Sequence, residues 1–220
     1  MATTISIALQ KGGSGKSSTA QALASTLGFK GKKVLLIDMD SQANVTYSSG
    51  VDEPETTITD VLGGGSKSAD AIIQCDLYDL LAGDGYLANV DSTEDVDMML
   101  LRDKIKPIQK RYDFIIVDTP PALGNLSYMS LVASDYVVIP TEPRIFSLNG
   151  LGKIHETIQN IQENENPKLK VLGILLIKYS NRTILNRSVK DMIEDYGEAE
   201  RLLRDALFSS VERRMTSDVP

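Results

Sequence analysis

A glycine-rich segment near the amino end, LQKGGSGKSST at residues 9–19, constrains the fold more than any other part of the chain. It follows an apolar run at residues 3–8 and precedes an amphipathic stretch at residues 16–29. A loop of this kind between a buried strand and a helix is typical of phosphate binding, because glycines let backbone N–H groups approach an anion closely. The helix that starts near Lys16 adds its positive end. The sequence therefore predicts an α/β fold organised around a phosphate-binding loop.

The loop departs from the common pattern G-x-x-x-x-G-K-[ST]. Gln10 stands where that pattern has its first glycine, and an additional lysine, Lys11, follows it. Lys16 is expected to reach the β- and γ-phosphates and Ser17 to offer its hydroxyl to Mg²⁺. Because phosphoryl transfer requires the γ-phosphate charge to be neutralised, Lys11 is a candidate for reaching the phosphates of a neighbouring subunit. The predicted nucleotide contacts are Lys11, Gly12, Gly13, Ser14, Gly15, Lys16, Ser17 and Ser18.

Apolar runs rich in Val and Ile alternate with helix-like stretches along the chain. The runs are residues 3–8, 33–40, 77–82, 113–119, 136–142 and 170–179; the helix-like stretches are 16–29, 95–110, 124–133 and 147–163. This alternation predicts an α/β, doubly wound, mostly parallel sheet with helices on both faces. A short helix is expected at Thr59–Leu62, and Gly28 and Gly31 are expected to end the first helix. Residues 182–207 have helical spacing, and 207–215 are expected to form a final strand.

Three aspartates follow predicted strands, at the edge where open α/β sheets bind ligands. Asp38 and Asp40 end the run LLIDMD, and Asp118 ends FIIVD. We expect Asp38 and Asp118 at the Mg²⁺, Asp118 through water, and Asp40 to orient the attacking water. Each aspartate alone is equally explained as a helix cap or turn residue. Together with the loop they predict hydrolysis of a nucleoside triphosphate, with Lys11, Lys16 and Asp40 as the catalytic residues.

Composition excludes several classes of protein. The single cysteine, Cys75, leaves no disulfide framework and no cysteine cluster for a metal. No apolar run reaches the roughly 18 residues of a membrane span, and the start lacks a signal peptide's basic segment, so a cytoplasmic location is expected. The net charge is −7. Residues 52–99 contain twelve acidic residues and one basic residue; they form either a solvated face or a dock for a basic partner segment.

The motifs together resemble the ParA/MinD family of deviant Walker ATPases. The family hallmark K-G-G-x-G-K-[ST] is matched at residues 11–17, and IIVDTPP at 115–121 is similar to its Walker B motif. LLIDMDSQANVT at 35–46 resembles its second motif, D-x-D-P-Q-x-N, with Ser41 in place of the usual proline. Segments 137–151 and 176–189 resemble the partition branch. The similarity covers about residues 2–196.

This resemblance implies a DNA-partition ATPase that uses ATP and Mg²⁺. It implies a homodimer with ATP sandwiched between subunits, in which Lys11 acts on the partner's nucleotide. It also implies non-specific DNA binding gated by ATP, a nucleoid-associated location, and a ParB-like centromere-binding partner that stimulates hydrolysis. Cationic DNA contacts are expected at Lys178, Arg182, Arg187 and Lys190, with Arg201, Arg204, Arg213 and Arg214 as further candidates.

Several expectations concern the limits of the chain. A single ATPase domain is expected over residues 1–220, with a carboxyl end that looks trimmed or lacks a final helix. We expect no DNA-binding extension before the first strand at about Thr3, and no membrane helix of the MinD type, since the tail ERRMTSDVP is short and polar. Two alternative functions stay open: a related ATPase that positions a protein cargo, and a nucleotide-dependent scaffold with little hydrolysis.

Overall fold

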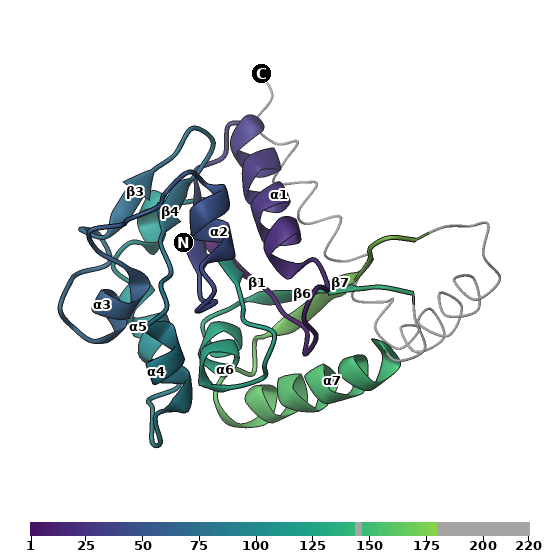
Figure 1. Cartoon of the computed structure of the whole chain (residues 1–220). Helices are drawn as coiled ribbons and strands as arrows, with labels where there is room; N and C mark the ends of the chain where they lie inside the picture. The colour runs from purple at the N-terminus through teal and green to yellow at the C-terminus, as the bar shows by residue number, and fades with distance from the viewer. Residues whose placement is uncertain (144–146, 180–220) are drawn as a thin grey trace.

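The computed structural model describes residues 1–143 and 147–179, with the side chains of residues 147–149 left aside. Within this part of the chain, seven strands form one sheet in the order β3-β4-β2-β5-β1-β6-β7 (Figure 1). The strands are β1 (Thr3–Ile7), β2 (Val34–Asp38), β3 (Ile72–Gln74), β4 (Asp79–Leu81), β5 (Phe114–Asp118), β6 (Tyr136–Thr141) and β7 (Lys170–Leu176). All neighbouring pairs are parallel except β3 and β4. The expectation of a mostly parallel sheet is confirmed.

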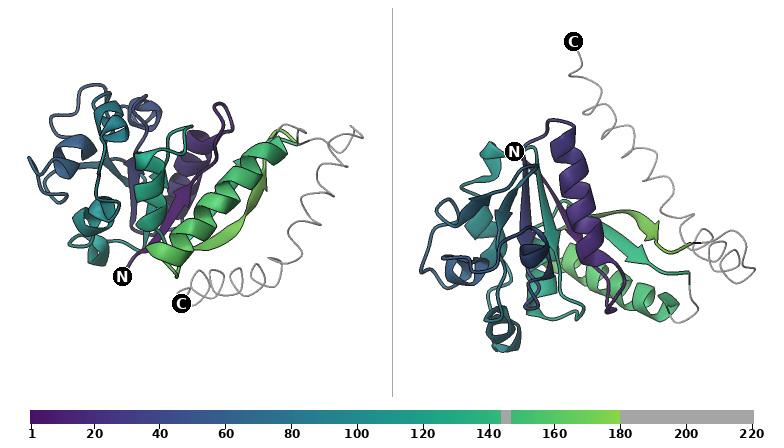
Figure 2. Two further views of the ribbon diagram at one scale, coloured as in Figure 1. Left: turned by 90° about the horizontal axis from the view of Figure 1, so that it is seen from below. Right: turned by 45° about the horizontal axis from the view of Figure 1, so that its top comes forward.

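Helices cover both faces of the sheet (Figure 2). They are α1 (Lys16–Phe29), α2 (Asn44–Ser48), α3 (Ile58–Leu62), α4 (Leu87–Ser92), α5 (Leu100–Ile105), α6 (Asn125–Val132) and α7 (Ser147–Asn164), with a 3₁₀ turn at Gln109–Arg111. Alternate side chains of β2 belong to different cores, as expected from the two-residue period of a strand. Val34 and Leu36 share a core with α1 and α2, whereas Leu35 and Ile37 share one with α3 to α6. α7 packs with α6 over β6 in a third cluster.

The central strands end level with one another. Asp38 of β2 and Ile7 of β1 are both register partners of Asp118 in β5. Because these strands are parallel, their carboxyl ends meet at one edge of the sheet. The loop that follows β1 and the carboxylates of Asp38 and Asp118 are therefore brought to the same edge by strand pairing alone.

Most elements agree with the sequence expectations, and the disagreements have local causes. α2, β3 and α4 were not expected; they have three to six residues, too few to display a clear period. The expectation of one helix over 95–110 is wrong, because α5 starts only at Leu100 and ends at Ile105. Pro107 follows within two residues, and it has no backbone N–H with which to continue the helical hydrogen bonds. The elements expected over 182–215 lie outside the described residues, and a single domain over 1–220 stays a prediction.

Gly28 does not end the first helix as expected, and Gly31 does. Gly31 follows the C-cap residue Lys30 and adopts a φ of 76°, in the left-handed region that favours glycine. Gly28 lies inside α1. A Cβ atom at Gly28 would lie 1.7 Å from the Leu77 carbonyl oxygen. Glycine at this position therefore allows α1 to pack directly against the turn that precedes β4.

Candidate active site

The loop between β1 and α1 has the backbone of an anion site. Gly13 and Gly15 adopt φ angles of 69° and 73°, which other residues adopt only with strain. Gly15 is the residue that precedes α1, and no side chain caps the first N–H groups of this helix. These donors, together with the positive end of the helix dipole, favour an anionic ligand. The loop therefore fits a phosphate group.

Lys16 is the buried cation of this loop. Its side chain is 6% exposed, and its Nζ donates a hydrogen bond of 3.1 Å to the carbonyl oxygen of Lys11. Burial lowers the pKa of Lys16, while the negative charges of Asp118 and Asp40 oppose that change. The Ser14 hydroxyl donates to the same Lys11 carbonyl, at 3.1 Å. The structure thus brings Lys16 together with two of the aspartates predicted for the site.

Asp118 is fully buried, and neither of its carboxylate oxygens has a hydrogen-bond partner of normal geometry. Burial raises the pKa of Asp118 to about 7, with Asp38 and Asp40 adding to the rise and the nearby Ser17 hydroxyl and Lys16 opposing it. A buried carboxylate without partners is costly in free energy. Its environment therefore favours a bound cation.

The donors at this edge fit Mg²⁺. In phosphate sites this ion is usually held by one or two carboxylates together with hydroxyl, water and phosphate oxygens. Asp118 supplies a carboxylate with free acceptor capacity, and Ser17 lies close enough to Asp118 to influence its pKa. Within residues 1–143 and 147–179, no three His, Cys, Asp or Glu side chains gather as a ready-made metal site. The residues thus suit an ion that shares its ligands with a phosphate chain.

Asp38, also predicted at the metal, has both of its oxygens engaged by the protein. Oδ2 accepts hydrogen bonds from the backbone N–H and the hydroxyl of Thr46, at 2.9 and 2.8 Å, and Oδ1 accepts from the Asp40 N–H at 3.2 Å. Burial raises the pKa of Asp38, and the bonds from Thr46 oppose that rise. The Gly83 N–H donates to the Thr46 hydroxyl at 2.9 Å. Asp38 thus fastens α2 and the loop after β4 to the end of β2, and its role as a metal ligand stays a prediction.

Asp40 lies in the tight turn between β2 and α2. It is 6% exposed, and its Oδ1 accepts a hydrogen bond of 3.0 Å from the Gln42 N–H. This contact spans Ser41, the residue that replaces the family's proline, so an aspartate-stabilised turn forms without it. The predicted role of Asp40 in orienting water is untested by this geometry, although its charge reaches Lys16.

Lys11 contacts its own subunit. Its Nζ lies 3.7 Å from Oε2 of Glu142, and Oε1 of the same carboxylate lies 2.6 Å from Lys178 Nζ. Lys178, predicted as a DNA contact, is therefore placed beside the phosphate loop. The other predicted DNA contacts lie outside the described residues: Arg182, Arg187, Lys190, Arg201, Arg204, Arg213 and Arg214.

Two residues of this site were missed from the sequence. Glu142 carried a usable signal, since it is an acidic residue at the end of the apolar run 136–142. Thr46 carried none, because a threonine eight residues after Asp38 follows no general spacing rule.

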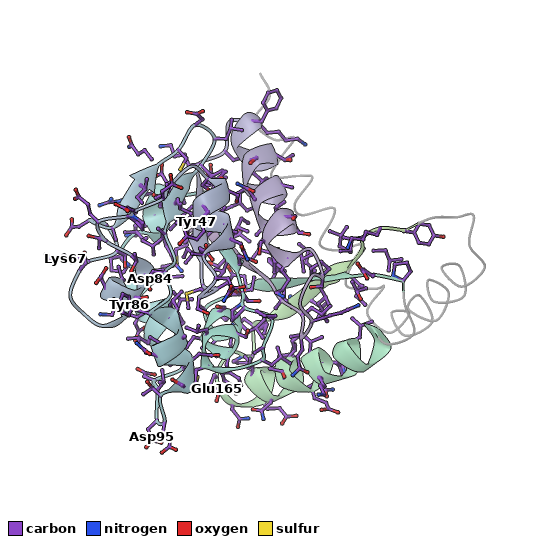
Figure 3. All side chains as sticks on the ribbon, in the orientation of Figure 1. Tyr47, Lys67, Asp84, Tyr86, Asp95 and Glu165 are labelled. Atoms are coloured by element: carbon purple, nitrogen blue, oxygen red, sulfur yellow. The ribbon has the colours of Figure 1, made fainter. Side chains whose placement is uncertain are left out.

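Many carboxylates of the acidic stretch 52–99 have structural roles. Asp60 completes a capping box at the start of α3, and Asp79 accepts a 2.7 Å hydrogen bond from the Tyr112 hydroxyl. Asp84 accepts from the hydroxyls of Thr57 and Thr59. Figure 3 shows Asp84 and Asp95 on the side of the molecule that carries α3 to α5. Asp52, Glu53 and Glu55 are exposed, as are several other acidic residues of this stretch, and a dock for a basic segment stays a prediction.

The fold and the loop together define a nucleotide-binding protein of the phosphate-loop NTPase class. A sequence family described as an AAA domain matches residues 2–171. With its second lysine in the loop, the chain belongs to the ParA/MinD family of deviant Walker A ATPases. No helix in the described part of the chain is long and apolar enough to cross a membrane.

Proteins similar in sequence over most of the chain include an uncharacterized protein and a chromosome partitioning protein. The chain is 37% identical over 208 residues to an uncharacterized protein of Pseudomonas putida, covering 89% of this chain and 77% of that protein. It is 33% identical over 204 residues to the chromosome partitioning protein ParA of Caulobacter vibrioides, covering 88% and 76%.

Solved structures are similar over most of the chain. Cobyrinic acid a,c-diamide synthase from Mycobacterium smegmatis, with bound ADP and magnesium, has a TM-score of 0.85 at 30% identity, covering 90% of this chain and 83% of that one. A plasmid partition protein from Borrelia burgdorferi has a TM-score of 0.70 at 26% identity, covering 89% and 98%. These similarities agree with the phosphate-loop fold.

Proposed function

We propose that the protein is a ParA-type ATPase for DNA segregation. ATP and Mg²⁺ bind at the loop between β1 and α1, and the bound ATP holds two subunits together. The dimer binds DNA without sequence preference, and hydrolysis to ADP and phosphate, stimulated by a ParB-like partner, releases it. The observation that carries this proposal is the placement of two lysines, Lys11 and Lys16, in one loop, with Asp40 and Asp118 close to Lys16.

Each residue of the site has a distinct task in this proposal. The free N–H groups at the start of α1 bind phosphate oxygens. Lys16 gives up its hydrogen bond to the Lys11 carbonyl oxygen and binds the β- and γ-phosphates instead. Asp40 orients the attacking water. Ser17 and Asp118 hold the Mg²⁺, which neutralises phosphate charge when bound. Lys11 reaches the nucleotide of the neighbouring subunit, where it neutralises charge that develops on the γ-phosphate.

Three solution measurements test the ATP switch: phosphate release, retention of DNA and oligomeric state. The wild type, Lys11→Ala and the control Lys153→Ala are compared with ATP, ADP and no nucleotide; Lys153 is an exposed residue of α7. The wild type and the control are expected to dimerise and retain DNA only with ATP, and Lys11→Ala to do neither. A wild type that stays monomeric with Mg²⁺ and a non-hydrolysable ATP analogue would contradict the proposal.

The DNA and partner steps are tested separately. Arg187→Glu is expected to abolish DNA retention and to leave ATP binding intact, and unchanged DNA retention would refute this assignment. DNA retention that depends neither on ATP nor on Arg187 would favour the ATPase that positions a protein cargo. A triple variant of Asp52, Glu53 and Glu55 to Asn or Gln is expected to lower stimulation by a basic partner segment, because charge complementarity speeds encounter.

A further inference from the structure

Glu142 is a nearly buried carboxylate shared by two lysines. It follows β6 directly and is 5% exposed. Lys178 Nζ donates a hydrogen bond of 2.6 Å to Oε1, and Lys11 Nζ lies 3.7 Å from Oε2. Lys178 follows β7 with a φ of 52°, an uncommon left-handed conformation for a residue with a side chain. The end of β7 is thereby linked through one carboxylate to the phosphate loop.

The same linkage reaches the phosphate-binding lysine. The carbonyl oxygen of Lys11 accepts hydrogen bonds from Lys16 Nζ and the Ser14 hydroxyl, both at 3.1 Å. Whatever fixes the position of Lys11 therefore also affects the position of Lys16. A carboxylate this close to Lys11 Nζ competes electrostatically with any second anion for the ammonium group.

We propose that Glu142 is a positioning residue that retains Lys11 within its own subunit, and that Lys178 weakens this retention by sharing the carboxylate. This inference rests on the proposed function, in which Lys11 acts across a dimer. Glu142 competes with the neighbouring phosphates for the Lys11 ammonium group. Lys178 sets the strength of that competition, since its own positive charge neutralises part of the Glu142 charge.

The two substitutions that test this idea shift dimerisation in opposite directions. Glu142→Gln keeps the shape of the side chain and removes the competing charge, so dimers form more readily. Lys178→Gln removes one of the cations that share Glu142 and leaves more of its charge for Lys11, so dimers form less readily. A purely structural role for this cluster would weaken dimerisation in both variants. In the double variant the effect of Lys178→Gln disappears, because Lys178 acts through Glu142.

The dimer dissociation constant is measured by sedimentation with Mg²⁺ and a non-hydrolysable ATP analogue. We expect Glu142→Gln to lower it and Lys178→Gln to raise it, each by about twofold to fivefold, the effect of one partly exposed ion pair. Glu156→Gln and Lys153→Gln, both exposed on α7, are the matched controls and leave it unchanged. Shifts in the same direction, or no shift, would overturn the proposal.

A second measurement does not depend on dimerisation. The acylation rate of the Lys11 amine by an amine-reactive reagent is followed by mass spectrometry in nucleotide-free protein. Weaker pairing with Glu142 makes this amine easier to acylate, so the rate rises in Glu142→Gln and falls in Lys178→Gln. If the wild type never dimerises and these rates still change as expected, the proposed function fails and the retention of Lys11 stands. Unchanged rates would refute the retention itself.

Discussion

Asp118 makes the stability of the protein depend on pH in an unusual direction. Burial raises its pKa from 3.8 to about 7, so the folded protein binds the proton more tightly than the unfolded chain does. A carboxylate of this kind contributes most stability below pH 4, and that contribution is lost as the pH rises towards 7. Asp118→Asn removes the titration and is the perturbation of choice.

The size of the effect follows from the pKa change. Each pKa unit corresponds to about 1.4 kcal/mol, so the full change from pH 4 to pH 8 is at most about 4 kcal/mol. Between pH 5.5 and pH 7 the free energy of unfolding of the wild type should fall by about 2 kcal/mol relative to Asp118→Asn. Above pH 8 the difference between the two proteins should be constant, because Asp118 is then ionised.

Urea unfolding of nucleotide-free, magnesium-free protein, followed by circular dichroism at half-unit pH steps, measures this difference. Asp95→Asn, a change to an exposed carboxylate, controls for the loss of one negative charge. A difference between the wild type and Asp118→Asn that is independent of pH would refute the reasoning. It would mean that Asp118 stays ionised in its buried position and has a partner that its geometry does not reveal.

Two further substitutions test how the site is supported. Thr46→Val removes the hydroxyl that donates a hydrogen bond to Asp38 and accepts one from Gly83. We expect the free energy of unfolding in urea to fall by about 1–3 kcal/mol. An unchanged value would contradict the assigned role of Asp38. Gly28→Ala places a Cβ atom 1.7 Å from the Leu77 carbonyl oxygen and should destabilise by about 2 kcal/mol or more. Gly152→Ala in α7, where the added Cβ meets nothing within 4 Å beyond its own stretch of helix, should instead be neutral or stabilising. Equal effects at both glycines would contradict the packing argument.

The sequence was informative wherever a pattern was long or chemically specific. The long parallel strands were predicted because their buried residues are continuous runs of Val, Ile and Leu, as expected for strands covered on both faces. Asp118 was predicted near the loop because parallel strands end at one edge. Gly13 and Gly15 were predicted as nucleotide contacts because a phosphate-binding loop requires backbone that approaches an anion closely.

Other features depend on tertiary contacts that no local pattern reports. β3 is too short to be distinguished from a turn, and it joins the sheet by its pairing with β4. The space available at Gly28 depends on Leu77, which lies far away in the sequence. Glu142 acquires its importance from Lys178, a residue 36 positions later. Such pairs become visible only when the sheet order is known.

The level ends of β1, β2 and β5 have a consequence for how the chain folds. Asp118 faces Ile7 on one side and Asp38 on the other, so a slip of one residue in any of these pairings would turn the affected side chains to the opposite face of the sheet. A chain that collapsed with misaligned strands would be compact but unable to assemble its carboxylates around the loop. Nucleotide binding should therefore report on correct strand alignment during refolding, before any measurement of DNA segregation is made.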